Sequence, residues 1–269
     1  MNKSYVHGYQ SEENERLRDQ AATLADLLHS GTSYAPEVRV LEVGCGVGAQ
    51  SITLARRSPQ ARITSIDVSA TSVAEARRNA AAAGINTVEF LQADIFSLPF
   101  GIQSFDHVFV CFVLEHLTDP EGALQALRKL LKPGGTITVI EGDHGSTLFH
   151  PGDPAAQDTI RCLVELQSRA GGNALIGREL YALLVAAGFV DASVEPRMAY
   201  ADASRPTWVD GFTRKTFMAM IEGVQRNAVD AGLITAERFA EGLDALERTT
   251  RPDGMFCYTF FKAVAQVHK

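Results

Sequence analysis

Three glycines at alternate positions end an apolar run near the start of the chain. Residues 38–43 are apolar apart from Arg39 and Glu42, and the turn 44–48, Gly-Cys-Gly-Val-Gly, follows directly. Glycine lets a chain reverse sharply and lets a ligand approach bare backbone. A helix expected from Ala49 points its free N–H groups toward whatever lies above the turn. This combination predicts a site for a nucleotide cofactor.

Acidic side chains stand where the neighbouring strands are expected to end. Asp67 directly follows an expected strand at 61–66, and Asp94 comes just after another at 87–92. Glu42 lies inside a strand that should be wholly apolar, so it needs a hydrogen-bond partner or a cationic ligand group. Asp67 also lies where a dinucleotide-binding protein has its ribose-binding acid, so the turn alone leaves NAD as an alternative.

Strands and helices alternate around these residues. We expect strands over residues 38–43, 61–66, 87–92, 105–111, 136–141, 189–195 and 255–264. We expect helices over 49–57, 71–83, 120–131, 156–170 and 178–187. Short turns join them, so the pattern predicts an α/β fold with a doubly wound, Rossmann-like sheet that is mostly parallel. Such sheets bind ligands at the carboxyl ends of their strands, where the glycine turn and both aspartates lie.

Two additions to this core are expected. Residues 1–34 comprise a polar, tyrosine-containing flap and an amphipathic helix over 12–29. The core takes residues 35–195 and 255–269, and residues 196–254 form a helical insertion that serves as a lid or an oligomer contact. A homo-oligomer through the first helix or the insertion is one use of these surfaces.

Composition argues against several classes of partner. The net charge is −7 and no basic run is present, which opposes binding to nucleic acid. No run approaches the roughly 20 apolar residues of a membrane span. Four cysteines lie far apart without a CxxC pair, so neither a metal site nor a disulfide framework is predicted. Free thiols indicate a cytoplasmic protein.

Taken together, the motifs resemble those of the class I S-adenosylmethionine-dependent methyltransferases. The segments are LEVGCGVG at 41–48, Asp67, QADIFSLPF at 92–100, FDHVFVCFVLEHL at 105–117 and LKPGG at 131–135. The resemblance implies a seven-stranded sheet with an antiparallel last strand, and S-adenosylmethionine as the donor that leaves as S-adenosylhomocysteine. It implies contacts with that cofactor from Glu42, Gly44, Cys45, Gly46, Gly48, Asp67, Val68, Ala93, Asp94, Ile95, Cys111 and Phe112.

The whole-chain pattern resembles bacterial enzymes that methylate small molecules, including those of natural-product pathways. In-line transfer to such an acceptor needs positioning above all. Glu115 and His116 after the fourth strand, and His144 after the fifth, are the candidates for a general base, with loop hydrogen bonding as the alternative role. Candidate substrate contacts are Tyr5, Tyr9, Asp143 and Trp208, and packing inside the lid is the alternative for Trp208. Other readings of the chain are an NAD-dependent oxidoreductase and a non-catalytic cofactor-binding or dimerisation protein.

Overall fold

One mixed sheet of seven strands organises the chain, in the order β3-β2-β1-β4-β5-β7-β6. The computed structural model describes residues 23–268. The strands are β1 Arg39–Val43, β2 Arg62–Asp67, β3 Val88–Gln92, β4 Phe105–Cys111, β5 Leu131–His150, β6 Val190–Asp202 and β7 Met255–Gln266. Strands β1 to β5 pair in parallel. The predicted α/β, Rossmann-like fold is therefore confirmed.

The last strand runs antiparallel to β5, as the resemblance implied. Gly134 N–H donates to the His268 carbonyl at 3.2 Å, and Val267 N–H donates to the Gly135 carbonyl at 3.0 Å. The partner number falls as the residue number rises, which is the mark of an antiparallel pair.

Helices follow the strands much as predicted. They are α2 Ala49–Arg57, α3 Ala70–Ala82, α4 Pro120–Leu130, α5 Pro154–Arg169, α6 Leu180–Ala186, α7 Pro206–Trp208, α8 Ala219–Gly223, α9 Gln225–Asp230 and α10 Ala236–Arg248. Short 3-10 helices span η1 Leu114–His116 and η2 Ile176–Glu179, and a π-helix spans η3 Val209–Met218. Helix α4 begins where the sequence predicts, because Asp119 accepts the Gly122 N–H at 2.8 Å and Pro120 needs no partner for its nitrogen.

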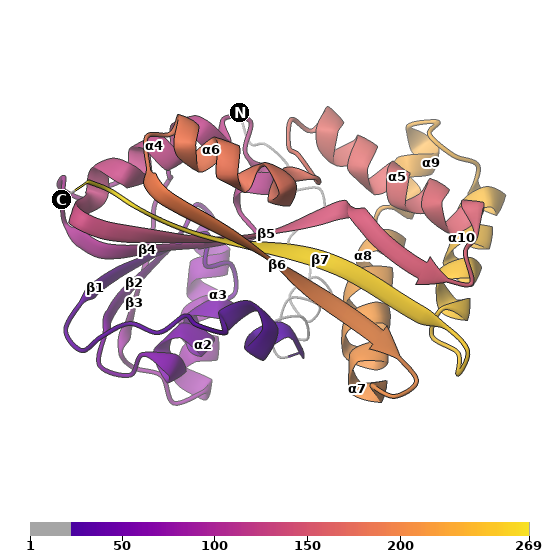
Figure 1. Cartoon of the computed structure of the whole chain (residues 1–269), viewed down its shortest axis with the longest axis horizontal. Coiled ribbons are helices and arrows are strands. Elements are labelled where there is room, and N and C mark those ends of the chain that lie inside the picture. Colours follow the sequence, from indigo (N-terminus) through magenta and orange to yellow (C-terminus); the bar gives the residue numbers. More distant parts are fainter. Residues whose placement is uncertain (1–22, 269) are drawn as a thin grey trace. The chain divides into compact units, whose positions relative to one another are not determined.

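The described chain divides into two compact units. The sheet unit takes residues 25–141, 176–196 and 261–268, and the helix-rich unit takes 23–24, 142–175 and 197–260. Within the sheet unit, α2 and α3 lie on one face of the sheet and α4 and α6 on the other (Figure 1). The helix-rich unit contains residues 142–175 as well as most of the predicted insertion. The role of that insertion as a lid or oligomer contact stays a prediction.

Strand β5 is longer than the sequence predicts. The expected strand ended at Glu141, which put Asp143 and His144 in a loop, whereas β5 runs to His150 and contains both residues. The glycines in this segment suggest a loop, but Thr259 N–H bonds to Ser146 Oγ at 3.0 Å where β5 lies beside β7. Pairing with an aromatic, β-branched neighbour overrides local propensity here.

Two further expectations concern the cysteines and membrane-spanning helices. All four cysteines are buried and free, which confirms the expectation of unpaired thiols. Between residues 23 and 268, no helix combines the length and the apolar character that crossing a bilayer requires.

Candidate cofactor and acceptor sites

The three glycines of the turn 44–48 serve different purposes. Their φ angles are 70°, 51° and 82°, values that favour glycine. A Cβ at Gly44 would lie 2.3 Å from the Val113 side chain, and one at Gly48 would lie 3.0 Å from Ala76 in α3. A Cβ at Gly46 would meet no described atom within 4 Å. Gly44 and Gly48 therefore allow close packing, and Gly46 is the glycine whose backbone a ligand can approach.

Cys45 faces away from that open side. Its side chain is 5% exposed and packs in a cluster with Val73, Ala76 and Phe90. Its N–H donates to the Ile66 carbonyl at 2.9 Å, which extends the pairing of β1 with β2. Only the backbone of Cys45 is thus placed to contact a ligand above the turn.

Asp67 ties the end of β2 to the glycine turn. Its Oδ2 accepts the Gly46 N–H at 2.9 Å, and its Oδ1 accepts the Ser69 N–H at 2.8 Å. Burial raises the pKa of Asp67, and the two N–H donors counteract that rise. Val68, the next residue, is 61% exposed. The carboxylate is held in one orientation at the strand end, which is what recognition of a ribose diol requires.

Glu42 is buried with partners that the sequence did not reveal. Its Oε2 accepts hydrogen bonds from the hydroxyls of Ser51 in α2 and Ser65 in β2, each at 2.5 Å. Burial raises the pKa of Glu42 to about 7, although the hydrogen bonds from the two hydroxyls act to lower this pKa. The hydrogen-bond partners that a buried Glu42 requires are therefore two serine hydroxyls. Contact with a cationic ligand group stays a prediction.

The raised pKa of Glu42 makes stability depend on pH. From about pH 4.5 to about pH 7 the folded protein keeps a proton that the unfolded chain has lost, so the free energy of unfolding falls as pH rises. Glutamine cannot ionise but still accepts from both hydroxyls. We expect Glu42→Gln to remove this decline and to be more stable than the wild type by about 3 kcal/mol above pH 7. Urea unfolding of both proteins between about pH 5 and pH 8 measures this difference in stability. If the free energies of unfolding of the wild type and the variant changed with pH in parallel, the prediction would be contradicted.

The ends of β2 and β3 lie side by side. Ala93 N–H donates to the Asp67 carbonyl at 3.0 Å, so the adenine-side candidates neighbour the ribose-side candidate. Asp94 is exposed, and its Oδ1 accepts the Phe96 N–H at 2.9 Å. Ile95 is 8% exposed and belongs to the main apolar core, so only an edge of its side chain can face a ligand.

The end of β4 carries an unusual backbone conformation. Cys111 is buried, and burial raises the pKa of its thiol well above the usual range. Phe112 is half-buried and has φ of 58°, in the left-handed region. Such strain in a bulky residue persists where its surroundings impose it, and it is common at functional sites. Nothing in the sequence predicts this conformation, because glycine and asparagine are the residue types that favour it and position 112 is phenylalanine.

Glu115 and His116 form a pair in η1. His116 Nε2 lies 3.6 Å from Glu115 Oε1, and their side chains are 23% and 11% exposed. The imidazole is therefore accessible and has a carboxylate beside it. This arrangement suits a group that takes up a proton, because the carboxylate stabilises the resulting cation.

The remaining acceptor-side candidates belong to the helix-rich unit or fall outside the described chain. His144 Nδ1 lies 3.2 Å from Tyr258 Oη, and both residues are buried. Asp143 is 2% exposed and accepts the Gly145 N–H at 2.9 Å. Trp208 is half-buried at the end of α7. Tyr5 and Tyr9 lie outside the described residues.

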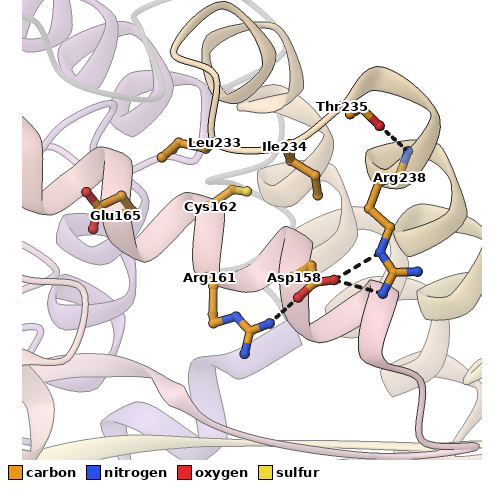
Figure 2. A pocket seen from close by; sticks show the side chains of 8 residues that line it. All are labelled: Asp158, Arg161, Cys162, Glu165, Leu233, Ile234, Thr235 and Arg238. Carbon is orange, nitrogen blue, oxygen red and sulfur yellow. Dashed lines mark hydrogen bonds and ion pairs between the residues drawn. The ribbon is translucent and has the colours of Figure 1, made fainter.

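A surface pocket of the helix-rich unit involves none of these candidates. It is lined by residues of α5, of α10 and of the segment before α10 (Figure 2). Asp158 accepts two hydrogen bonds from Arg238, at 2.9 and 2.8 Å, and also pairs with Arg161. The opposite charges satisfy one another, so the cluster joins two helices and nothing in it points to a ligand.

Comparison with known proteins identifies this arrangement. Residues 40–135 match the family model described as a methyltransferase domain. Demethylmenaquinone methyltransferase of Thermus thermophilus is 38% identical over 103 residues, which are 38% of this chain and 46% of the relative. The 27-O-demethylrifamycin SV methyltransferase of Amycolatopsis mediterranei is 27% identical over 225 residues, 83% of this chain and 76% of the relative. The crystal structure of the [4+2]-cyclase SpnF superimposes with a TM-score of 0.59 at 26% identity, covering 93% of this chain and 82% of that one.

Residues 40–135 form a methyltransferase domain of the class I S-adenosylmethionine-dependent type. The cofactor of this class is S-adenosylmethionine, which excludes the NAD reading that the glycine turn alone left open. The open side of Gly46 and the oriented carboxylate of Asp67 fit such a ligand. The chain spans 63%, 46% and 48% of the lengths of the first three curated relatives that it matches.

Proposed function

We propose that the chain transfers the methyl group of S-adenosylmethionine to a small-molecule acceptor. The observation that carries the proposal is the order of the strand ends. Strands β3, β2, β1 and β4 are neighbours, and their carboxyl ends bear Asp94, Asp67, the glycine turn and Phe112 respectively. That order matches adenine, ribose, methionine and methyl group along one extended ligand.

The acceptor that we propose is a hydroxyl group of a natural product. The long match to the rifamycin methyltransferase, over 83% of this chain, supports this choice. The net charge of −7 argues against a nucleic-acid acceptor. His144, Asp143 and Trp208 of the helix-rich unit stay candidate acceptor contacts, and a homo-oligomer stays a separate proposal that light scattering can test.

His116 is the proposed general base. The acceptor oxygen forms a bond to the methyl carbon while the bond from that carbon to sulfur breaks, and the electron pair leaves with the neutral thioether. The acceptor proton passes to the His116 imidazole, where the carboxylate of Glu115 stabilises the cation. General-base assistance of this kind raises the reaction rate by about 10²–10⁴-fold.

A panel of acceptors tests the proposal. The purified protein should release S-adenosylhomocysteine when incubated with S-adenosylmethionine and a macrocyclic, aromatic or quinone-derived hydroxyl compound. With the best acceptor, we expect His116→Ala to lower kcat by about 100-fold near neutral pH. His107→Ala is the matched control, because His107 lies in the first half of β4. Loss of less than threefold in His116→Ala would refute the base assignment.

A second function deserves a test because of the likeness to SpnF. At 26% identity over 93% of this chain, that [4+2]-cyclase supports cyclisation of a small molecule as an alternative function of this chain. Mass spectrometry separates the two functions. A product heavier than the acceptor by one methylene indicates methyl transfer, and a product of unchanged mass without release of S-adenosylhomocysteine indicates cyclisation.

A further inference from the structure

A fully buried carboxyl group stands at the end of the predicted fifth strand. Glu141 has no exposed surface, and its Oε1 accepts the Val113 N–H at 2.9 Å and the Leu114 N–H at 2.8 Å. No partner among the described residues bonds to its Oε2. Burying a carboxyl group costs free energy. A buried carboxyl group that accepts two backbone N–H groups from the loop after a neighbouring strand is therefore expected to have a specific role.

The two donors belong to the segment that leaves β4. Phe112 N–H donates to the Ile140 carbonyl at 2.9 Å, which continues the β4–β5 pairing by one residue. The Glu141 side chain then takes the next two N–H groups. Three successive N–H groups are thus fixed by two successive residues of β5. These bonds fix the backbone on both sides of the φ of 58° at Phe112.

The same segment rests on the cofactor turn. The Val113 side chain packs so closely on Gly44 that a Cβ there would lie 2.3 Å from it. Glu141 holds the Val113 backbone, so the carboxyl group sets where the β4 segment meets the turn. The turn has bonds of its own, from Cys45 N–H to the Ile66 carbonyl and from Gly46 N–H to Asp67, both at 2.9 Å.

We propose that Glu141 is a positioning residue, whose carboxyl oxygen fixes Phe112, Val113 and Leu114 so that η1 presents His116 toward the reacting methyl group. Glu141 acts through this segment and touches neither substrate. The proposal rests on the proposed methyl transfer, because it assigns the β4 segment to the face where the methyl group emerges.

The surroundings of the Glu141 carboxyl group disfavour its charged form. Burial raises the pKa of Glu141 well above the usual range, and the nearby charge of Glu115 raises it further, while the backbone N–H donors of η1 oppose the rise. Cys111, beside it in β4, is also uncharged because its pKa is raised. A neutral amide should therefore replace the acid, since its carbonyl accepts the same two N–H groups.

Three variants test the assignment. In Glu141→Leu we expect kcat to fall about 30-fold, while the Kd for S-adenosylhomocysteine changes less than about threefold because the turn keeps its own bonds. In Glu141→Gln we expect kcat within about threefold of the wild type. Leu127→Ala, a fully buried α4 residue, is the stability-matched control, expected to lose about 2–5 kcal/mol with kcat unchanged at a temperature where all the variants are folded. Equal losses of kcat in Glu141→Leu and Leu127→Ala, or failure of Glu141→Gln to restore it, would overturn the proposal.

Amide hydrogen exchange keeps the test independent of the acceptor. We expect the N–H groups of residues 112–114 to lose protection in Glu141→Leu and to keep it in Glu141→Gln, with Leu127→Ala giving only uniform loss. If no acceptor is turned over, the proposed function fails while exchange still decides whether Glu141 holds this segment. Unchanged protection at residues 112–114 in Glu141→Leu would refute the role of Glu141 by itself.

Discussion

Gly44→Ala should unfold far more easily than the wild type. The new methyl group would lie 2.3 Å from the Val113 side chain, and the residue would keep a φ of 70° that alanine tolerates poorly. The left-handed conformation costs about 1–2 kcal/mol and overpacking costs about 1–3 kcal/mol, so we expect a total loss of about 2–5 kcal/mol. Urea unfolding followed by circular dichroism measures the loss.

Gly46→Ala is the matched comparison two residues away. Its φ is 51°, but its Cβ would meet no described atom within 4 Å, so only the conformational cost of about 1–2 kcal/mol applies. The new methyl group instead occupies the face assigned to the cofactor. We expect the Kd for S-adenosylhomocysteine to rise at least about tenfold by calorimetry. Equal destabilisation of the two variants, or unimpaired binding by Gly46→Ala, would refute this division of roles.

Local sequence signals were enough to predict the fold. Helix α2 is found at the predicted bounds because a left-handed glycine precedes it and Ser58-Pro59 ends it. Strand β4 is also found as predicted, since the apolar run 108–111 is typical of a strand buried on both faces of a parallel sheet. Glycine, proline and apolar runs influence the conformation of only a few neighbouring residues, so their effects can be predicted from the sequence alone.

The partners of buried polar groups could not be predicted in the same way. Glu42 in β1 accepts hydrogen bonds from Ser51 in α2 and from Ser65 in β2. Their meeting depends on the register that pairs Glu42 with Ser65 across β1 and β2. Glu141 likewise finds its donors only because β4 and β5 are neighbours. The position of Glu42 in an apolar strand predicts that it needs a partner, but nothing in the sequence identifies the serines as that partner, since serine is equally common on a solvated surface.

Asp67→Ala should abolish tight binding of the cofactor. The wild-type carboxylate is oriented by the N–H groups of Gly46 and Ser69, and the proposed function assigns its outer side to the ribose hydroxyls. Hydrogen bonds to a charged group are worth about 1.5–3 kcal/mol, so the Kd for S-adenosylhomocysteine should rise by about 10–150-fold. Asp67→Asn keeps one carbonyl acceptor and should give an intermediate value.

Asp106→Ala separates cofactor recognition from the loss of a structural carboxylate. Asp106 also accepts a backbone N–H, from Arg39 at 2.8 Å, and it pairs with Lys132 at 2.7 Å, but it lies at the start of β4. Ligands of parallel sheets bind at the opposite, carboxyl ends of the strands. The variant should therefore lose stability without a change in Kd beyond about threefold. If both aspartate variants weaken binding equally, the effect of Asp67 reflects general destabilisation, and the ribose contact must be assigned elsewhere.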